Sequence, residues 1–208
     1  MKQNVRVFRQ RKRIRFLWTL SPLLVALLLF TEPKWMHGDV RNEMIRQLGA
    51  LALFTCIIGR CWASLHIGGQ KNQQLITSGP YSRTRNPLYF FSSVGLAGVG
   101  LAVGSMTLGA VFFCFGYLAF SYVIRREEWA LEQFFRGEYR AYVMLVPRFF
   151  PSLSENLEPT TTEQVLYKPQ ALHTTFRQAL LFLLPIPLYN VLQYLHASGI
   201  IEPVMKLY

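Results

Sequence analysis

Cysteine and histidine are too few and too scattered in this sequence to build a metal site. The 208 residues contain three cysteines and four histidines. Cys56, Cys61 and Cys114 all lie inside apolar stretches, and no two of them form a C-x-x-C pair. A bound zinc ion needs three or four such ligands brought together. We therefore expect no metal, and we interpret the cysteines as small buried apolar residues.

Charged residues are scarce as well, which disfavours an ordinary soluble domain. They make up 16% of the chain, whereas hydrophobic residues make up 51%; a soluble domain carries about 25% charged residues. The apolar residues form five blocks nearly free of charge, at 16–30, 47–67, 88–104, 106–124 and 178–201. About 20 such residues span the hydrocarbon core of a bilayer, and the first block needs residues 31–36 to reach that length. The sequence predicts an all-α integral membrane bundle of about five transmembrane helices, and Pro185 and Pro187 predict a kink in the last.

Acidic residues are half as frequent as basic ones, and the formal net charge is +11. A basic chain is often a nucleic-acid binder, but the positions of the charges argue against that here. Threading five helices through a membrane places 17 of the 22 lysines and arginines on one side. Such a bias marks the cytoplasmic side. We expect a bacterial inner-membrane protein with a cytoplasmic N-terminus and cytoplasmic basic loops, whose basic arm contacts anionic lipid headgroups rather than nucleic acid.

Between the second and third blocks lies "ITSGPYSRTRNPLYF", residues 76–90, with Arg83 and Arg85 in its middle. Its Gly-Pro and Asn-Pro pairs predict a turn followed by an extended segment. Pro87 suits the first position of the next helix. That helix contains a G-x-x-x-G spacing at Gly100 and Gly104, which predicts close packing of helix backbones. Gly104 and the serine after it predict a tight turn into a return helix.

From Arg125 the pattern becomes that of an amphipathic helix at the membrane surface. Steps of three or four residues from Glu127 define an apolar face of Leu131, Phe134, Phe135 and then Glu138 or Tyr139. The opposite, solvated stripe is predicted to hold Glu128, Glu132 and Arg136, with the last two paired at i,i+4. Glu127 is thus a carboxylate on the packed face. Either it pairs with Arg125 or Arg126 near the helix end, or it faces a ligand or a cation.

Two segments together resemble the isoprenylcysteine carboxyl methyltransferase family and its phospholipid-methylating relatives. They are "TSGPYSRTRNPLYF" and "EEWALEQFFRGEYRAYVMLVPRFFP", and the resemblance covers residues 73–151. The first half of the family pattern falls on Gly79, Tyr81, Arg85, Asn86, Pro87 and Tyr89. The second half falls on Glu127, Glu128, Leu131, Phe135, Tyr139, Tyr142, Val146, Pro147, Arg148 and Pro151.

The resemblance implies that S-adenosylmethionine binds between the loop and the amphipathic helix, with its methyl group facing a tunnel open to lipid. By position, the cofactor-binding residues would be Gln73, Gln74, Leu75, Ile76, Tyr81, Arg85, Asn86, Pro87, Leu88, Tyr89 and Glu127. The residue types suit this cofactor. Aromatic faces attract a sulfonium cation, a carboxylate suits positive charge or ribose hydroxyls, and arginine suits the cofactor's carboxylate.

The chain departs from the family pattern at two positions. The family's histidine before proline is Asn86 here, which does not titrate near pH 7. An anionic acceptor needs no base, so the change favours O-methylation of a carboxylate or phosphate. An arginine that contacts the substrate in some members falls on Val123, and Arg125 or Arg126 are its candidate replacements. No catalytic nucleophile is required, because the protein chiefly aligns the reactants.

The expected function is therefore methyl transfer to a lipid-like or lipid-anchored acceptor. N-methylation of an aminophospholipid and a catalytically silent membrane scaffold remain as alternatives. Arg60 and His66, on the second predicted helix, have two interpretations each: packing and snorkelling, or a role near the cofactor or an anionic headgroup.

The chain divides into five predicted parts. They are a basic arm (1–15), two transmembrane helices (16–67), a methyltransferase core (68–151), a polar cytoplasmic linker (152–177) and a C-terminal transmembrane helix (178–208).

Overall fold

The computed structural model describes residues 26, 28, 31–33, 39–67, 75–153, 169–200 and 205–207. The longer helices among these residues are α2 (Val40–Ile67), α3 (Pro87–Ala102), α4 (Met106–Leu145) and α6 (Pro185–Ala197). Smaller elements are η1 (Gly79–Ser82), α5 (Pro169–Leu180) and η2 (Leu181–Leu183). Two three-residue strands, β1 (Thr31–Pro33) and β2 (Met205–Leu207), pair in parallel. The expected helical architecture is confirmed, with this short strand pair added.

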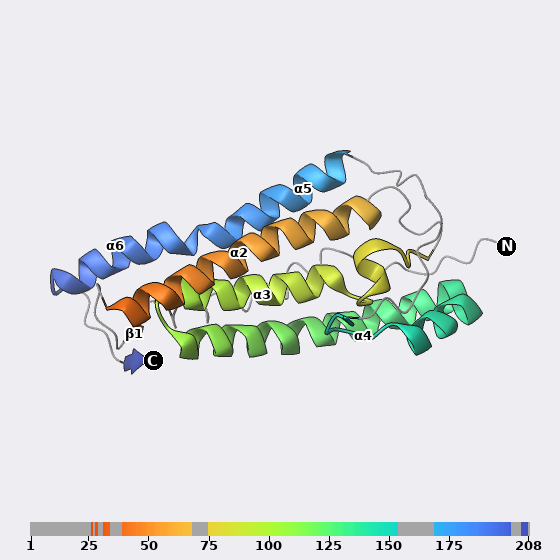
Figure 1. The fold of residues 1–208 in the computed structure, drawn as a ribbon, viewed down its shortest axis with the longest axis horizontal. Helices are drawn as coiled ribbons and strands as arrows, with labels where there is room; N and C mark the ends of the chain where they lie inside the picture. The colour runs from red at the N-terminus through yellow and green to blue at the C-terminus, as the bar shows by residue number, and fades with distance from the viewer. Residues whose placement is uncertain are drawn as a thin grey trace.

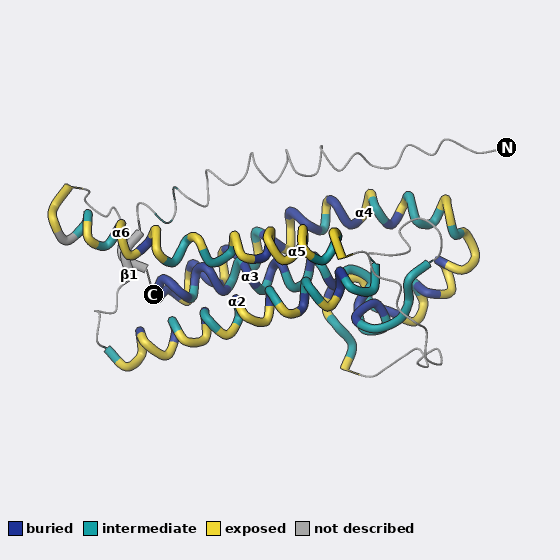
Figure 2. Tube along the Cα trace, turned by 90° about the horizontal axis from the view of Figure 1, so that it is seen from above, coloured by how far each residue is buried: buried dark blue, intermediate teal, exposed yellow. Residues whose placement is uncertain are grey.

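The helices lie side by side along one long axis, with α3 in the middle (Figure 1). α3 contacts α2 on one side and α4 on the other, and α5 packs on α2. Buried residues follow α3 and the facing side of α4, whereas the outer side of α2 is exposed (Figure 2). α3 is therefore the central helix of the described bundle.

Small residues let α3 approach its neighbours closely. A Cβ atom added to Gly100 would overlap the backbone nitrogen of Gly109 in α4, and one added to Gly49 of α2 would overlap the backbone of Ala102. Gly104 has a φ of 88° and forms the turn between α3 and α4. Ser105 then caps α4, accepting a hydrogen bond from the amide of Leu108 at 3.1 Å. The predicted tight hairpin and the close packing at Gly100 are confirmed.

Within the part of the chain that the structure describes, three helical segments are long and apolar enough to cross a membrane: Val40–Ile67, Met106–Leu145 and Pro169–His196. α3 is apolar but has only 16 residues. The five predicted spans are therefore not confirmed within the described residues. The basic arm at 1–15 and nearly all of the first apolar block lie outside these residues.

The predicted return helix and the predicted amphipathic helix are one element, α4, of 40 residues. The helix is interrupted at Arg136, whose φ of 41° and ψ of −107° are non-helical. The interruption changes the pairing expected on this stretch. Glu132 forms its ion pair with Arg140 at 3.1 Å instead of with Arg136.

The C-terminal helical segment begins earlier than expected. α5 starts at Pro169, so the last nine residues of the predicted polar linker are helical, and residues 154–168 lie outside the description. The predicted kink before Pro185 is present as the turn η2, which separates α5 from α6.

Candidate functional site

The segment from Leu75 to Asn86 lies at one end of the bundle and packs on the last turns of α4. Tyr81 is buried in the turn η1, and its carbonyl oxygen accepts a hydrogen bond from the Tyr142 hydroxyl at 2.6 Å. Leu75 packs against the buried cluster of Tyr139, Tyr142 and Val146. These contacts join the loop before α3 to the end of α4, two segments about 60 residues apart.

Residues 146–152 leave α4 and form a strap, which we define by this range, along the same loop. The amide of Arg85 donates to the carbonyl of Pro147 at 2.9 Å, and the amide of Ser152 donates to the carbonyl of Arg83 at 2.8 Å. Between these two bonds, the buried Thr84 hydroxyl donates to the carbonyl of Phe149 at 3.0 Å. The strap thereby closes the loop against the bundle through its backbone.

Tyr89 and Glu127 join the two halves of the site directly. Tyr89 lies one turn into α3 and is buried, and its hydroxyl donates to Glu127 Oε1 at 2.8 Å. The ring of Tyr89 packs at 5.2 Å from that of Phe120, in an apolar cluster with Val123 and Phe149. Two of the residues expected to bind the cofactor, Tyr89 and Glu127, are thus in direct contact, and their role with a cofactor stays a prediction.

Glu128, the next residue, is the centre of a charged cluster that the sequence pattern does not predict. Its side chain is only 9% exposed. Arg85 Nη1 lies 3.1 Å from Glu128 Oε1, and Arg148 Nε lies 2.9 Å from Glu128 Oε2. Asn86 Nδ2 donates to the carbonyl of Arg148 at 3.0 Å and approaches Glu128 Oε1 at 3.4 Å. We call Arg85, Glu128 and Arg148 the arginine–glutamate cluster.

The prediction that Glu128 lies on a solvated stripe is therefore wrong. On α4 the buried positions Phe112, Gly116, Phe120 and Ile124 recur every four residues, and Glu128 is the next in that series. The correct helical phase is thus set by the apolar part of the same helix. On the predicted apolar face, Leu131 and Phe135 do pack against the Tyr139 cluster, but Phe134 is 43% exposed.

The environment of Tyr81 keeps its phenol protonated. Burial raises the pKa of Tyr81 well above its usual value, and the nearby Glu127 carboxylate raises it further. The Tyr81 phenol therefore stays protonated well above neutral pH.

The other predicted site residues differ in where they lie. Pro87 begins α3 as predicted, and Leu88 and Ile76 are half-buried near that end of the bundle. Gln73 and Gln74 lie outside the described residues. Val123, at the position of the family's substrate arginine, is completely enclosed in the apolar cluster.

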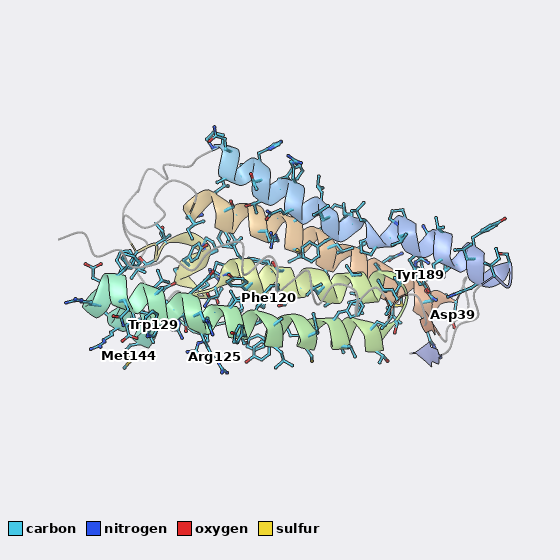
Figure 3. The ribbon with its side chains drawn as sticks, turned by 180° about the vertical axis from the view of Figure 1, so that it is seen from behind. Asp39, Phe120, Arg125, Trp129, Met144 and Tyr189 are labelled. Carbon is cyan, nitrogen blue, oxygen red and sulfur yellow. The ribbon has the colours of Figure 1, made fainter. Side chains whose placement is uncertain are left out.

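Arg125 and Arg126 do not lie within the arginine–glutamate cluster. Both are exposed on α4, and the guanidinium of Arg126 lies 5.2 Å over the ring of Tyr122. Arg125 projects from the outer side of α4 together with Trp129 and Met144 (Figure 3). Their proposed contact with substrate stays a prediction.

Arg60 and His66 occupy different surroundings on α2. The guanidinium of Arg60 donates to the hydroxyl of Ser92, one turn along α3 from Tyr89, and lies 5.8 Å over the ring of Phe182. The ring of His66 packs against Gly79, where any Cβ atom would overlap it. His66 therefore supports the turn η1, and the positive φ of Gly79, 60°, requires glycine there.

A loop, an apolar helical hairpin and a strap thus gather two carboxylates, a phenol and two guanidinium groups at one end of a membrane-type bundle. The phospholipid methyltransferase family profile matches residues 50–138, which include the loop, the hairpin, Tyr89 and both glutamates. The chain belongs to this family.

Two relatives carry names that refer to metal resistance. The chain is 36% identical over 147 residues to the cobalt-zinc-cadmium resistance protein CzcN of Cupriavidus metallidurans, an alignment that covers 71% of this chain and 67% of the relative. It is 34% identical over 147 residues to the nickel-cobalt-cadmium resistance protein NccN of Alcaligenes xylosoxydans xylosoxydans, covering 71% and 68%. No solved structure matches the chain. Within the described residues no group of three or more histidine, cysteine or acidic side chains could hold a metal ion.

Proposed function

We propose that this protein is an S-adenosylmethionine-dependent methyltransferase acting on a lipid-like or lipid-anchored acceptor at the membrane surface. The observation that carries the proposal is the 2.8 Å hydrogen bond from Tyr89 to Glu127. It joins both halves of the family's motif, 38 residues apart, in a chain of the phospholipid methyltransferase family.

The side chains present fit the cofactor by their chemistry. Glu127 supplies a carboxylate for ribose hydroxyls or positive charge, and the ring of Tyr89 supplies a π-face for a cation. The Tyr89 hydroxyl fixes one oxygen of Glu127, so the carboxylate is oriented before any ligand arrives. Pre-orientation of this kind lowers the entropic cost of binding.

Alignment and exclusion of water would be the protein's contribution to the reaction. S-adenosylmethionine supplies an electrophilic methyl group on a positively charged sulfur, which an anionic oxygen can accept without a base. The apolar cluster around Tyr89, formed by Phe120, Val123 and Phe149, keeps one side of the site dry and strengthens local electrostatics. Holding two reactants in line is worth several kcal/mol, up to about 11 in favourable cases.

The acceptor is proposed to carry a carboxylate or a phosphate. Asn86 stands where a base would be needed for an ammonium substrate, and its amide nitrogen bonds to Arg148 and Glu128. That arrangement supports a positioning role for Asn86 instead of proton transfer, and so favours O-methylation over N-methylation.

The proposed location is a bacterial inner membrane, with the loop, the strap and the N-terminus on the cytoplasmic side. The start of the α5 segment and the end of α2 lie at the same end of the bundle as η1 (Figure 1), as that orientation requires. Reporter fusions after residue 15 and after residue 163 should both give cytoplasmic signals; a signal from the other side at either position would reverse the orientation.

We further propose a role in tolerance of divalent metals, because the names of two relatives refer to metal resistance. Divalent cations bind carboxylate and phosphate oxygens, and methylating such an oxygen removes one negative charge from the membrane surface. Loss of the gene should then raise sensitivity to cobalt, cadmium or nickel. Unchanged tolerance to all three metals would contradict the proposed role in metal tolerance but not the proposed methyltransferase activity.

Glu127→Gln tests the site. It keeps the shape of the side chain and a hydrogen-bond acceptor for Tyr89 but removes the charge. A charged hydrogen bond contributes about 1.5–3 kcal/mol, so affinity for S-adenosylmethionine should fall by roughly ten- to a hundredfold. Isothermal titration of the full chain in detergent measures this affinity.

Glu132→Gln is the matched control, because Glu132 lies on the same helix and pairs with the exposed Arg140. It should leave the affinity unchanged. If the wild-type protein fails to bind S-adenosylmethionine, the scaffold alternative is correct. Equal losses at Glu127 and Glu132 would show that the site is elsewhere.

A further inference from the structure

Arg148 is held in place by one edge of its guanidinium group. Its Nε atom donates to Glu128 Oε2 at 2.9 Å, and its carbonyl oxygen accepts from Asn86 Nδ2 at 3.0 Å. The side chain is nevertheless 52% exposed. A guanidinium group has five N–H donors, and in the described part of the chain Glu128 is its one bonded partner, through Nε. The outer donors of Arg148 therefore face away from that carboxylate.

The charge of the arginine–glutamate cluster is unbalanced. Two guanidinium groups share the single carboxylate of Glu128, so these three side chains together carry one positive charge; the neighbouring carboxylate, Glu127, bonds to Tyr89 outside the cluster. Arg85 and Glu128 are about nine-tenths buried, with side-chain exposures of 10% and 9%, so water can compensate that charge only around Arg148. An excess charge beside a buried pair is costly unless a counter-ion approaches it. An anion at Arg148 would complete the cluster.

The position of Arg148 relates this charge to the site of methyl transfer. Asn86 contacts both Arg148 and Glu128, and it directly precedes α3, which carries Tyr89. Glu127, the partner of Tyr89, is adjacent to Glu128 in α4. Arg148 is thus linked through Asn86 and Glu128 to the parts of α3 and α4 that carry Tyr89 and Glu127.

We propose that the outer N–H groups of Arg148 form an anion subsite, which binds a carboxylate or phosphate group of a molecule occupying the Tyr89–Glu127 site. The proposal rests on the proposed function and extends it. Two sources have this chemistry: the amino-acid carboxylate of the cofactor and the acidic group of the acceptor. Arginine binds either by paired hydrogen bonds from one edge of its plane.

Arg148→Gln is a clean perturbation of this subsite. It removes the outer donors, but Glu128 keeps its ion pair with the buried Arg85, so the buried carboxylate is not left without a cation. Arg148→Lys keeps the charge and loses the paired geometry. Arg140→Gln is the matched control, because Arg140 also bonds through Nε to a glutamate of α4, Glu132, at 3.1 Å, and its side chain is 76% exposed.

The experiment is isothermal titration of the full chain in detergent with three probes. They are S-adenosylhomocysteine, decarboxylated S-adenosylmethionine and glycerol 3-phosphate. If the subsite binds the cofactor's carboxylate, Arg148→Gln should lower the affinity for S-adenosylhomocysteine by about ten- to a hundredfold. The affinity for decarboxylated S-adenosylmethionine should then be unchanged. If it binds the acceptor's anion, S-adenosylhomocysteine should be unaffected and glycerol 3-phosphate binding lost. Arg148→Lys should fall between the wild type and Arg148→Gln.

Different results would refute the anion subsite and the proposed function. Wild-type protein that binds neither adenosyl compound refutes the cofactor proposal, and glycerol 3-phosphate then tests the subsite alone. The subsite is refuted if Arg148→Gln binds every probe with the same affinity as the wild type and Arg140→Gln. It is also refuted if the wild type binds none of the three probes. Unfolding temperatures of each variant, measured in the same detergent, separate loss of binding from loss of fold.

Discussion

Exchanging Glu128 for glutamine should destabilise the protein far more than the same exchange at Glu127. Glu128 is the only anion in contact with Arg85 and Arg148 among the described residues, and its side chain is 9% exposed. Glutamine keeps the size and one acceptor oxygen but leaves the buried Arg85 without a counter-charge. At Glu127, in contrast, the Tyr89 hydroxyl can donate to the new amide oxygen as it does to the carboxylate.

The size of the effect follows from how deeply each partner is buried. Breaking a buried ion pair by removing one partner costs about 3–5 kcal/mol. Arg148 is half exposed and can be solvated, and glutamine keeps one hydrogen bond, so about 2–4 kcal/mol is expected for Glu128→Gln. For a chain of this length, 1 kcal/mol shifts the unfolding temperature by about 2–4 °C. Glu128→Gln should therefore lower it by roughly 5–15 °C, whereas Glu127→Gln, losing about 1 kcal/mol, should lower it by about 2–4 °C.

Thermal unfolding in detergent, followed by circular dichroism at the helical band, measures both shifts. Replacing Arg85 with methionine and Glu128 with glutamine in one protein should lower the free energy of unfolding by less than the sum of the two single changes. The reason is that the double variant has no unpaired buried charge at Arg85. Equal shifts for Glu127→Gln and Glu128→Gln, or a shift below about 2 °C for the latter, would show that the cluster does not anchor the loop.

Two further changes test the hairpin and the strap. Gly100→Val should cost about 3 kcal/mol or more and reduce the yield of folded protein, because any Cβ atom there overlaps the backbone of α4; Gly137→Ala, at an open position, should be neutral or stabilising, and a tolerated Gly100→Val would contradict the close packing. Thr84→Val should cost about 1–3 kcal/mol by removing the buried hydrogen bond to Phe149, whereas Thr174→Val, on the exposed side of α5, should change the unfolding temperature little. Similar shifts for the two threonines would mean that the strap is held by its apolar contacts alone.

The hairpin and the meeting of the two motif halves could be predicted because local signals specify them. Gly104, Ser105 and Pro87 determine where the chain turns and where α3 begins, and a closed hairpin returns α4 to the level of Tyr89. The contact with Glu127 then follows from chain geometry.

A helical period counted from Glu127, as if a new helix began near Arg125, places Glu128 on the wrong face of the helix. α4 is continuous there, and its four-residue series through Phe120 and Ile124 leads to Glu128. The apolar residues of α4 therefore indicate the helical phase that buries Glu128.

The strap could not be predicted, for a different reason. Its bonds to Arg83 and Arg85 are made by backbone amides and carbonyls, which every residue has. The side chains of 146–152 indicate a family motif but not the segment with which it pairs. The five expected spans are not confirmed among the described residues, because α3 is apolar but has only 16 residues, and apolarity alone does not measure length.

The shortness of α3 has a consequence for how an acceptor reaches the site. Sixteen residues form a helix of about 24 Å, whereas the hydrocarbon core of a bilayer is about 30 Å thick. If the turn at Gly104 reaches one face of that core, Tyr89 lies several ångströms below the other face, at the depth of the upper acyl chains. An acceptor of lipid type could then arrive by diffusing sideways within its own leaflet, without its tails leaving the hydrocarbon, while a water-soluble cofactor would enter from above past the loop and the strap. The two substrates would thus come from different phases, and neither would block the path of the other.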